Sequence, residues 1–163
     1  MKKIVSFLID GPERLSAPLG WLGPLSARLC VGWVFLWSGW EKLHALPQMI
    51  ANFTEWGIPF PTILTPFASG VEFVGGLFLL LGLFTRIAGP ALVIIMAVAI
   101  VSAKLDQINS FETFFGFEEV AYMALFGWLS IAGPGAVSVD YLLQRMTETK
   151  TRGAVVTPTP VTA

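Results

Sequence analysis

Residues 87–103 have the sequence IAGPALVIIMAVAIVSA, an uncharged run of 17 residues between Arg86 and Lys104. This run is close to the length of about 20 residues with which an α-helix crosses the hydrocarbon core of a bilayer. It contains almost none of the polar residues that form the outer face of a helix in a soluble bundle. A second uncharged run, of 20 residues, covers 120–139. The two runs therefore predict two membrane-spanning helices.

The composition of the whole chain also indicates a membrane protein. Its 163 residues are 55% hydrophobic and 13% charged, whereas charged residues make up about 25% of a typical soluble protein. Ten Lys and Arg against eleven Asp and Glu give a formal net charge of −1, without the basic stripe that binds phosphates, which excludes nucleic acid as a partner. Cys30 and His44 are the only cysteine and histidine. They cannot form a zinc, bis-histidine haem or iron–sulfur site, so we expect no metal, and no cofactor is detectable from motifs.

Two further spans are predicted from longer stretches with few charges. Residues 57–85 contain Glu72 as their only charge, so this span would bury a carboxylate. Residues 25–43 carry their charges near the ends, where long basic side chains can reach the membrane interface. The sequence thus predicts an all-α membrane protein with a four-helix transmembrane bundle. The expected spans are, in order, about 25–43, 66–84, 87–103 and 118–133.

The distribution of Lys and Arg predicts the orientation of this bundle. Cytoplasmic loops of membrane proteins carry an excess of these residues. Seven of them fall on the side that holds both termini and two on the opposite side, so we expect both termini in the cytoplasm. The seven are Lys2, Lys3, Arg14, Arg86, Arg145, Lys150 and Arg152, and the two are Lys42 and Lys104.

The segments outside the spans divide the chain further. Residues 1–24 are expected to be a cytoplasmic or interfacial segment, and the transmembrane domain with its attached helices covers 25–146. Within that domain, residues 48–56 have apolar side chains at helical spacing and predict a short helix in the outer interface. A second interfacial helix is expected after the fourth span, up to residue 146, as a membrane anchor. Residues 147–163 show no periodicity and are expected to be disordered.

Charged residues share helix faces with glycines in two of the predicted spans. In the first span the shared face holds Arg28, Gly32, Phe35, Gly39 and Lys42, and in the second it holds Glu72, Gly75, Leu79, Gly82 and Arg86. Glycines on one face let two helix backbones approach closely. If the two spans run antiparallel, Lys42 meets Glu72 near the outer side, and Arg28 lies near Arg86 at the inner side. Asp140 is at the depth required to accept either arginine.

The outer charges together predict a candidate pocket in the outer leaflet. Lys42, Glu72 and Glu119 are expected at similar depth, with Trp40 among the neighbouring aromatic residues. Such a pocket suits a flat apolar ligand such as a quinone, with a carbonyl bound by Lys42 and protons exchanged through Glu72 or Glu119. A structural interpretation stays open, in which Lys42 and Glu72 fix helix register and the aromatic residues form an interfacial belt. No catalytic residue can be assigned.

The order and spacing of several motifs resemble the DoxX family of small four-helix bacterial membrane proteins, over about residues 25–143. The matching residues are Arg28-Leu-Cys-Val-Gly32 with Phe35, Gly39 and Lys42; Trp56-Gly57-Ile58-Pro59; Glu72 with Gly75-Gly76; Leu83-Phe84-Thr85-Arg86; and Gly133-Pro134-Gly135 leading to Ser138-Val139-Asp140. The family is similar to the membrane subunits of thiosulfate:quinone oxidoreductases. The resemblance implies a protein of the bacterial plasma (inner) membrane that acts with partner proteins in quinone-linked or thiol-stress redox metabolism.

Three functions remain open at this point. The first is a quinone-interacting membrane subunit of an oxidoreductase, whose electrons would pass through a redox partner protein because the chain has no nucleotide motif and no second cysteine. The second is a non-enzymatic membrane scaffold or assembly factor. The third is a small proton-coupled transporter, for which a homo-oligomer would have to supply the lumen. The first two also allow a homo-oligomer in the lipid bilayer.

Overall fold

The structure is a computed structural model that describes the backbone of residues 17–154 and the side chains of residues 18–147. Within these residues all regular secondary structure is helical, and no strand occurs. The helices are η1 (Ala17–Leu19), α2 (Leu22–His44), α3 (Leu46–Glu55), α4 (Pro61–Leu81), α5 (Thr85–Ala99), η2 (Ile100–Lys104), η3 (Leu105–Gln107), α6 (Phe111–Phe115), α7 (Glu118–Ala132) and α8 (Val139–Ala154).

Helices are present at all four predicted spans, as α2, α4, α5 and α7. Two helical segments of the described chain are both long and apolar enough to cross a membrane. These are α4, with 21 residues, and the continuous helix 85–107, with 23 residues, which consists of α5, the π-helix η2 and the 3-10 turn η3. The helix α7, at the fourth predicted span, has 15 residues, which is shorter than the roughly 20 residues of a typical membrane-spanning helix.

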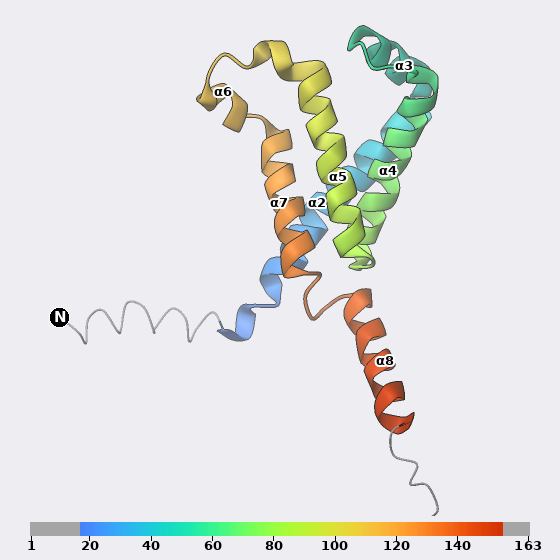
Figure 1. The fold of residues 1–163 in the computed structure, drawn as a ribbon, viewed down its shortest axis with the longest axis vertical. Helices are drawn as coiled ribbons and strands as arrows, with labels where there is room; N and C mark the ends of the chain where they lie inside the picture. Colours follow the sequence, from blue (N-terminus) through green and yellow to red (C-terminus); the bar gives the residue numbers. More distant parts are fainter. Residues whose placement is uncertain (1–16, 155–163) are drawn as a thin grey trace, which may run out of the picture.

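The four long helices pack as two neighbouring pairs (Figure 1). The helix α2 packs along α4, and α5 packs along α7, while α4 and α5 join the two pairs. The first pair is very close: a Cβ atom added to Gly39 would lie 2.7 Å from the Cα atom of Phe73. The expected glycine contact between these spans is therefore present, with one change. Gly76 faces α2, whereas Gly75 faces Leu92 of α5.

Apolar side chains fill the space between the four helices and also cover much of the surface. Phe35 of α2 packs edge-on against Phe126 of α7, with the ring centroids 4.8 Å apart, and Leu79 and Leu92 are fully buried beside them. On the outside many large apolar residues are exposed, and Ile131 is 83% exposed. Exposed apolar surface of this extent marks a contact with lipid or with another protein.

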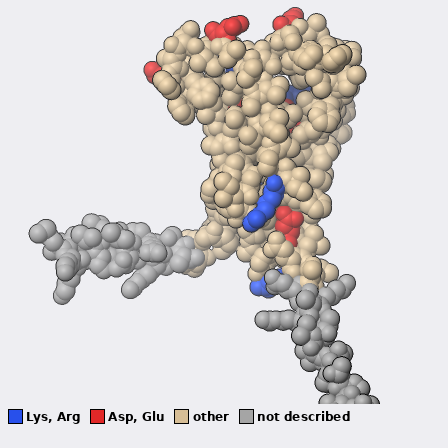
Figure 2. Space-filling view, in the orientation of Figure 1, with Lys and Arg blue, Asp and Glu red and all other residues tan. Residues whose placement is uncertain are grey.

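The short helices lie at opposite ends of the bundle (Figure 1). The helices α3 and α6 lie at one end, here called the α3/α6 end, and α8 lies at the other, here called the α8 end. In Figure 2, acidic side chains gather at the α3/α6 end, and much of the surface below them is uncharged. The exposed acidic residues of that end are Glu41, Glu55, Asp106, Glu112 and Glu118.

Several helix boundaries differ from those expected. The helix α2 begins at Leu22, three residues before the predicted start, and residues 1–16 of the N-terminal segment lie outside the described part. The helix predicted over 48–56 is present as α3. The predicted disorder from residue 147 is wrong for 147–154, because α8 continues to Ala154, and the remainder of that tail lies outside the described residues.

The second predicted span begins earlier and ends earlier than expected. Pro61 occupies the first turn of α4, where proline is favoured because it has no N–H to leave unpaired. Pro66, expected near the start of the span, therefore lies inside the helix. The helix ends at Gly82, which adopts the left-handed conformation with φ of 64° that glycine reaches without strain.

Candidate functional site

An ion pair between the partly exposed Lys42 and the buried Glu72 joins the two closely packed helices α2 and α4 toward the α3/α6 end. Lys42 Nζ donates to both carboxylate oxygens of Glu72, at 2.7 Å and 2.6 Å. Ser38 Oγ donates to Glu72 Oε2 at 3.0 Å. The Glu72 side chain is only 4% exposed. A buried carboxylate is tolerated when it has a countercharge and hydrogen bonds, and Glu72 has both.

A second ion pair joins the other two helices. Lys104 Nζ lies 2.6 Å from Glu119 Oε1 and donates to Oε2 at 2.8 Å. The same ammonium lies 5.1 Å from the centre of the Phe117 ring, where the π-electrons attract a cation. Lys104 is the last residue of the π-helix η2. Short π-helical segments are rare and frequently occur at functional sites.

A pocket of about 170 Å³ lies where the first ion pair faces Glu119 across the bundle. It brings together Lys42, Glu72 and Glu119, three of the four residues expected in the outer pocket. It also places a phenol beside the carboxylates, because Tyr122 Oη donates to Glu118 Oε2 at 3.5 Å. The remaining lining residues are Val34, Phe35, Ser38, Met96, Glu118 and Tyr122.

Trp40, the fourth expected residue, does not line this pocket. Its ring packs against the His44 ring, with centroids 4.1 Å apart, and near Phe73 at 5.9 Å. Depth along the helix places Trp40 correctly at the level of Lys42, but two residues of an α-helix at this spacing are rotated by about 200° from each other. Trp40 therefore points away from the pocket that Lys42 faces.

Sequence reasoning did not identify Ser38 or Tyr122 as pocket residues, and it did not pair Lys104 with Glu119. Ser38 could have been found from its position four residues before Lys42, on the same helix face. Tyr122 lies three residues after Glu119 and shares its face for the same reason. The Lys104–Glu119 pair had no such signal, because the geometry of the π-helix that ends at Lys104, and of η3 and α6 between the two residues, is not visible in the sequence pattern.

At the α8 end, the expected pairing of Asp140 with an arginine is not found among the described residues. The Asp140 carboxylate accepts the backbone N–H groups of Phe84 and Thr85, at 2.9 Å and 3.2 Å. These are unpaired donors at the start of α5, which a carboxylate stabilises as a capping group. The Asp140 N–H in turn donates to the carbonyl oxygen of Gly82 at 3.0 Å. Asp140 thus fastens the start of α8 to the turn between α4 and α5.

The two arginines of this end have different environments. Arg28 is buried, and its guanidinium donates to the carbonyl oxygens of Val137 and Pro24. Its Nη1 atom has no hydrogen-bond partner in the described part of the chain and lies against Gly82. Arg86 is exposed. Neither arginine forms an ion pair within the described part of the chain.

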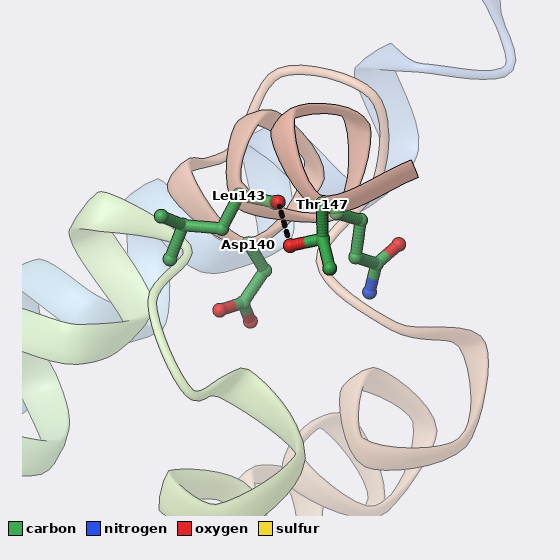
Figure 3. A pocket seen from close by; sticks show the side chains of 4 residues that line it. Asp140, Leu143 and Thr147 are labelled. Carbon is green, nitrogen blue, oxygen red and sulfur yellow. Dashed lines mark hydrogen bonds between the residues drawn. The ribbon is translucent and has the colours of Figure 1, made fainter. Parts of the chain in front are cut away.

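A second, open pocket of about 420 Å³ lies along α8. Figure 3 shows Asp140, Leu143 and Thr147 at its wall, with the Thr147 hydroxyl donating to the Leu143 carbonyl oxygen at 2.9 Å. The Asp140 carboxylate is already engaged by the start of α5. This pocket therefore contains no charged group that is free to hold a ligand among its lining residues.

Comparison with known proteins gives consistent matches. The family model of DoxX matches residues 23–105. The protein named "Uncharacterized membrane protein Rv3486" of Mycobacterium tuberculosis is 36% identical over 129 residues, which cover 72% of this chain and 79% of the relative. "Putative oxidoreductase CatD" of Bacillus subtilis is 27% identical over 71% of this chain and 81% of its own length. "Inner membrane protein YqjF" of Escherichia coli is 28% identical, over 76% and 94%. No solved structure matches.

Proposed function

From the premise that this chain belongs to the DoxX family of membrane proteins, we propose that it is a membrane subunit that binds the headgroup of a quinone or quinol. The proposed site is the pocket between Lys42 and Glu119. The observation that carries the proposal is the arrangement of an ion pair with a buried carboxylate, a second carboxylate and a phenol around one cavity. The Bacillus subtilis relative is named a putative oxidoreductase, which agrees with a redox function.

The groups that line the pocket match the chemistry of such a headgroup. An ammonium has three N–H donors, and Lys42 directs two of them to Glu72, which leaves one for a ligand carbonyl. Glu118 and Glu119 can accept hydrogen bonds from ligand hydroxyls. Phe35, Met96 and Val34 provide the apolar walls that a flat ring requires.

The size of the pocket limits what it can hold. Its volume of about 170 Å³ is below the roughly 300–1,000 Å³ of pockets that enclose drug-sized ligands. It therefore suits a single ring, and an apolar tail would lie outside. Val34 lines the pocket and is also exposed, so a tail could leave beside it along the lipid-facing side of α2.

Proton exchange in this site is assigned to Glu72 and Glu119. A quinone, when bound, carries electrons and protons together, and the protein residues would hold or release those protons. Protonation of Glu72 would remove the negative charge that holds Lys42, so the ammonium could then turn toward the ligand. The electrons would come from a redox partner protein, because Cys30 is the only cysteine of the chain.

We further infer that α2, α4, the helix 85–107 and α7 all cross the bacterial plasma (inner) membrane, with both termini in the cytoplasm. The excess of Lys and Arg on the side of the termini supports this orientation. The name of the Escherichia coli relative agrees with that membrane. In this orientation the α3/α6 end and the pocket face the outer side.

The proposal is tested by measuring the quinone that copurifies with the protein in nanodiscs, by solvent extraction and chromatography. We expect close to one quinone per protein for the natural sequence and loss of quinone in Lys42→Ala and Glu72→Gln. Glu41→Gln is the matched control, because Glu41 is exposed next to Lys42 and bonds Trp37 rather than Glu72. Size-exclusion profiles and thermal melts establish that each variant is folded. A natural-sequence protein with no more quinone than the surrounding lipid would contradict the proposal.

A second candidate function is a scaffold or assembly factor. The specific observation in its favour is that Glu72 already accepts three hydrogen bonds from Lys42 and Ser38, as a structural pair would. In that case Glu72→Gln would lower the melting temperature, and no quinone would be present to lose. A proton-coupled transporter, with a homo-oligomer supplying the lumen, would instead show pH-driven flux in proteoliposomes.

A further inference from the structure

A row of buried polar side chains runs along α4 and ends at Glu72. Thr65 is 0% exposed, Ser69 is 1% exposed and Glu72 is 3% exposed. Their spacing of four and three residues places all three on one face of the helix. Most other residues of α4 are apolar. Three buried polar groups in line are unusual in a helix of this composition, since each must find a hydrogen-bond partner.

Ser69 and Thr65 differ in how this requirement is met. Ser69 Oγ donates to the backbone carbonyl oxygen of Thr65 at 2.8 Å, as serines in apolar helices commonly do. Its oxygen can still accept a hydrogen bond. The Thr65 hydroxyl has no hydrogen-bond partner among the described residues. A buried hydroxyl without a partner costs free energy, so Thr65 points to a polar partner outside the protein atoms.

Pro66 also leaves one backbone acceptor of α4 without its helical donor. Pro66 lies inside α4 and has no N–H, so the carbonyl of Thr62 lacks the helical donor it would otherwise have. An internal water typically makes two to four hydrogen bonds to such groups. The unpaired hydroxyl of Thr65 and the open acceptor of Ser69 are the kind of buried partners that hold water inside a protein.

The row of polar side chains extends along α4 from near its first residue to Glu72. Pro61 begins α4, and with a rise of 1.5 Å per residue Thr65 lies about 6 Å and Glu72 about 16 Å from that start. The helix α3 packs against α4 and lies at the same end of the bundle (Figure 1). Neither Thr65 nor Ser69 lines the pocket. The row therefore lies between the start of α4 at the α3/α6 end and Glu72, outside the lining of the pocket.

We propose that Thr65 and Ser69 line a hydrated path that connects the α3/α6 end with Glu72 and carries protons to and from its carboxylate, separately from the ligand pocket. The proposal rests on the proposed function only in assigning proton exchange to Glu72, and it requires no quinone. The charged and titratable groups that face Glu72 are Lys42 of α2 and, across the pocket, Glu118, Glu119 and Tyr122 of α7.

Hydration of the path can be tested on the natural sequence in lipid bilayers by solid-state NMR, with magnetisation transferred from water protons to side-chain carbons. We expect the side-chain signals of Thr65 and Ser69 to rise several-fold faster than those of Leu79. Leu79 is the matched control, because it is equally buried on the same helix. Signals of Thr65 and Leu79 that rise at the same rate would overturn the proposal.

The proton path is tested with two variants of Thr65. Thr65→Val keeps the shape and removes the hydroxyl, whereas Thr65→Ser keeps the hydroxyl. After a rapid drop in pH, the loss of the Glu72 carboxylate band is followed by infrared spectroscopy, and the band is identified by its absence in Glu72→Gln. We expect protonation to slow several-fold in Thr65→Val and to stay near the natural rate in Thr65→Ser.

The outcomes separate this proposal from the proposed function. An unchanged rate in Thr65→Val would overturn the path, even if quinone binds in the pocket. The path is likewise overturned if Glu72 does not protonate while the protein remains folded. Slower protonation in Thr65→Val in a protein that retains no quinone would support the path and reject the quinone site. Slower protonation together with a quinone content equal to that of the natural sequence would support both.

Discussion

The Asp140 carboxylate lies 2.9 Å from the backbone nitrogen of Phe84, although 56 residues separate the two in the sequence. Phe84 has a positive φ of 48°, which side-chain-bearing residues adopt only at a cost. The hydrogen bond from the Phe84 N–H to Asp140 therefore lies where the chain turns sharply from α4 into α5. A single carboxylate holds this turn and the start of α8 together.

Removal of this carboxylate should destabilise the protein. We expect Asp140→Ala to lower the free energy of unfolding by about 1–2 kcal/mol, the usual cost of losing a helix cap. Gln144→Ala, an exposed change one turn further along α8, should stay within about 0.5 kcal/mol. Thermal unfolding in detergent measures both. Equal stability of the two variants would show that the cap does not hold the turn.

The close packing of α2 on α4 predicts strong sensitivity to one added methyl group. A Cβ at Gly39 would lie 2.7 Å from the Cα atom of Phe73, so Gly39→Ala should separate the helices and destabilise the protein by about 1–3 kcal/mol. Gly70→Ala is the matched control on α4, because nothing lies within 4 Å of its added Cβ. It should be neutral or stabilising by up to about 1 kcal/mol. Comparable melting temperatures for both variants would contradict the observed packing.

The two ion pairs should differ in their contribution to stability. The side chain of Glu72 is 4% exposed and that of Glu119 is 13% exposed, so removal of Lys42 leaves the more deeply buried charge without a partner. We expect Lys42→Met to lower the melting temperature more than Lys104→Met does. Combination with Glu72→Gln and Glu119→Gln, respectively, should restore part of the loss, with coupling of roughly 0.5–3 kcal/mol. An absence of coupling in unfolding experiments would indicate that the pairs do not stabilise the fold.

The inferred orientation predicts which positions a membrane-impermeant thiol reagent can reach in intact cells. In a Cys30→Ser background, Glu112→Cys on α6 should be labelled from outside. Gln144→Cys on α8 should be labelled only after the cells are opened. Both positions are exposed in the structure, so accessibility of the side chain does not limit either reaction. The reverse labelling pattern would place the termini outside.

The contact between Lys42 and Glu72 could be predicted because both residues share a helix face with glycines, and antiparallel packing of those faces leaves them at the same level. The orientation of Trp40 could not be predicted from depth alone, because depth does not specify rotation about the helix. The partners of Asp140 could not be predicted, because they are backbone N–H groups. Almost every residue type has such a group, so no side chain in the sequence marks the contact. The expected start of α4 lies too late because Pro66 is typical of a helix boundary, whereas proline inside a helix is tolerated when packing compensates the missing bond.

The distribution of the two ion pairs also has a mechanical consequence. One pair joins α2 to α4, the other joins the helix 85–107 to α7, and within the described residues no ion pair links one half of the bundle to the other. At the α8 end, the two halves are held by Asp140 and by the bond from Arg28 to Val137. At the pocket they meet through Phe35 and Tyr122, whose rings are 5.1 Å apart. The charges thus stabilise each half separately, and near the pocket the two halves are held by apolar and aromatic packing rather than by ion pairs.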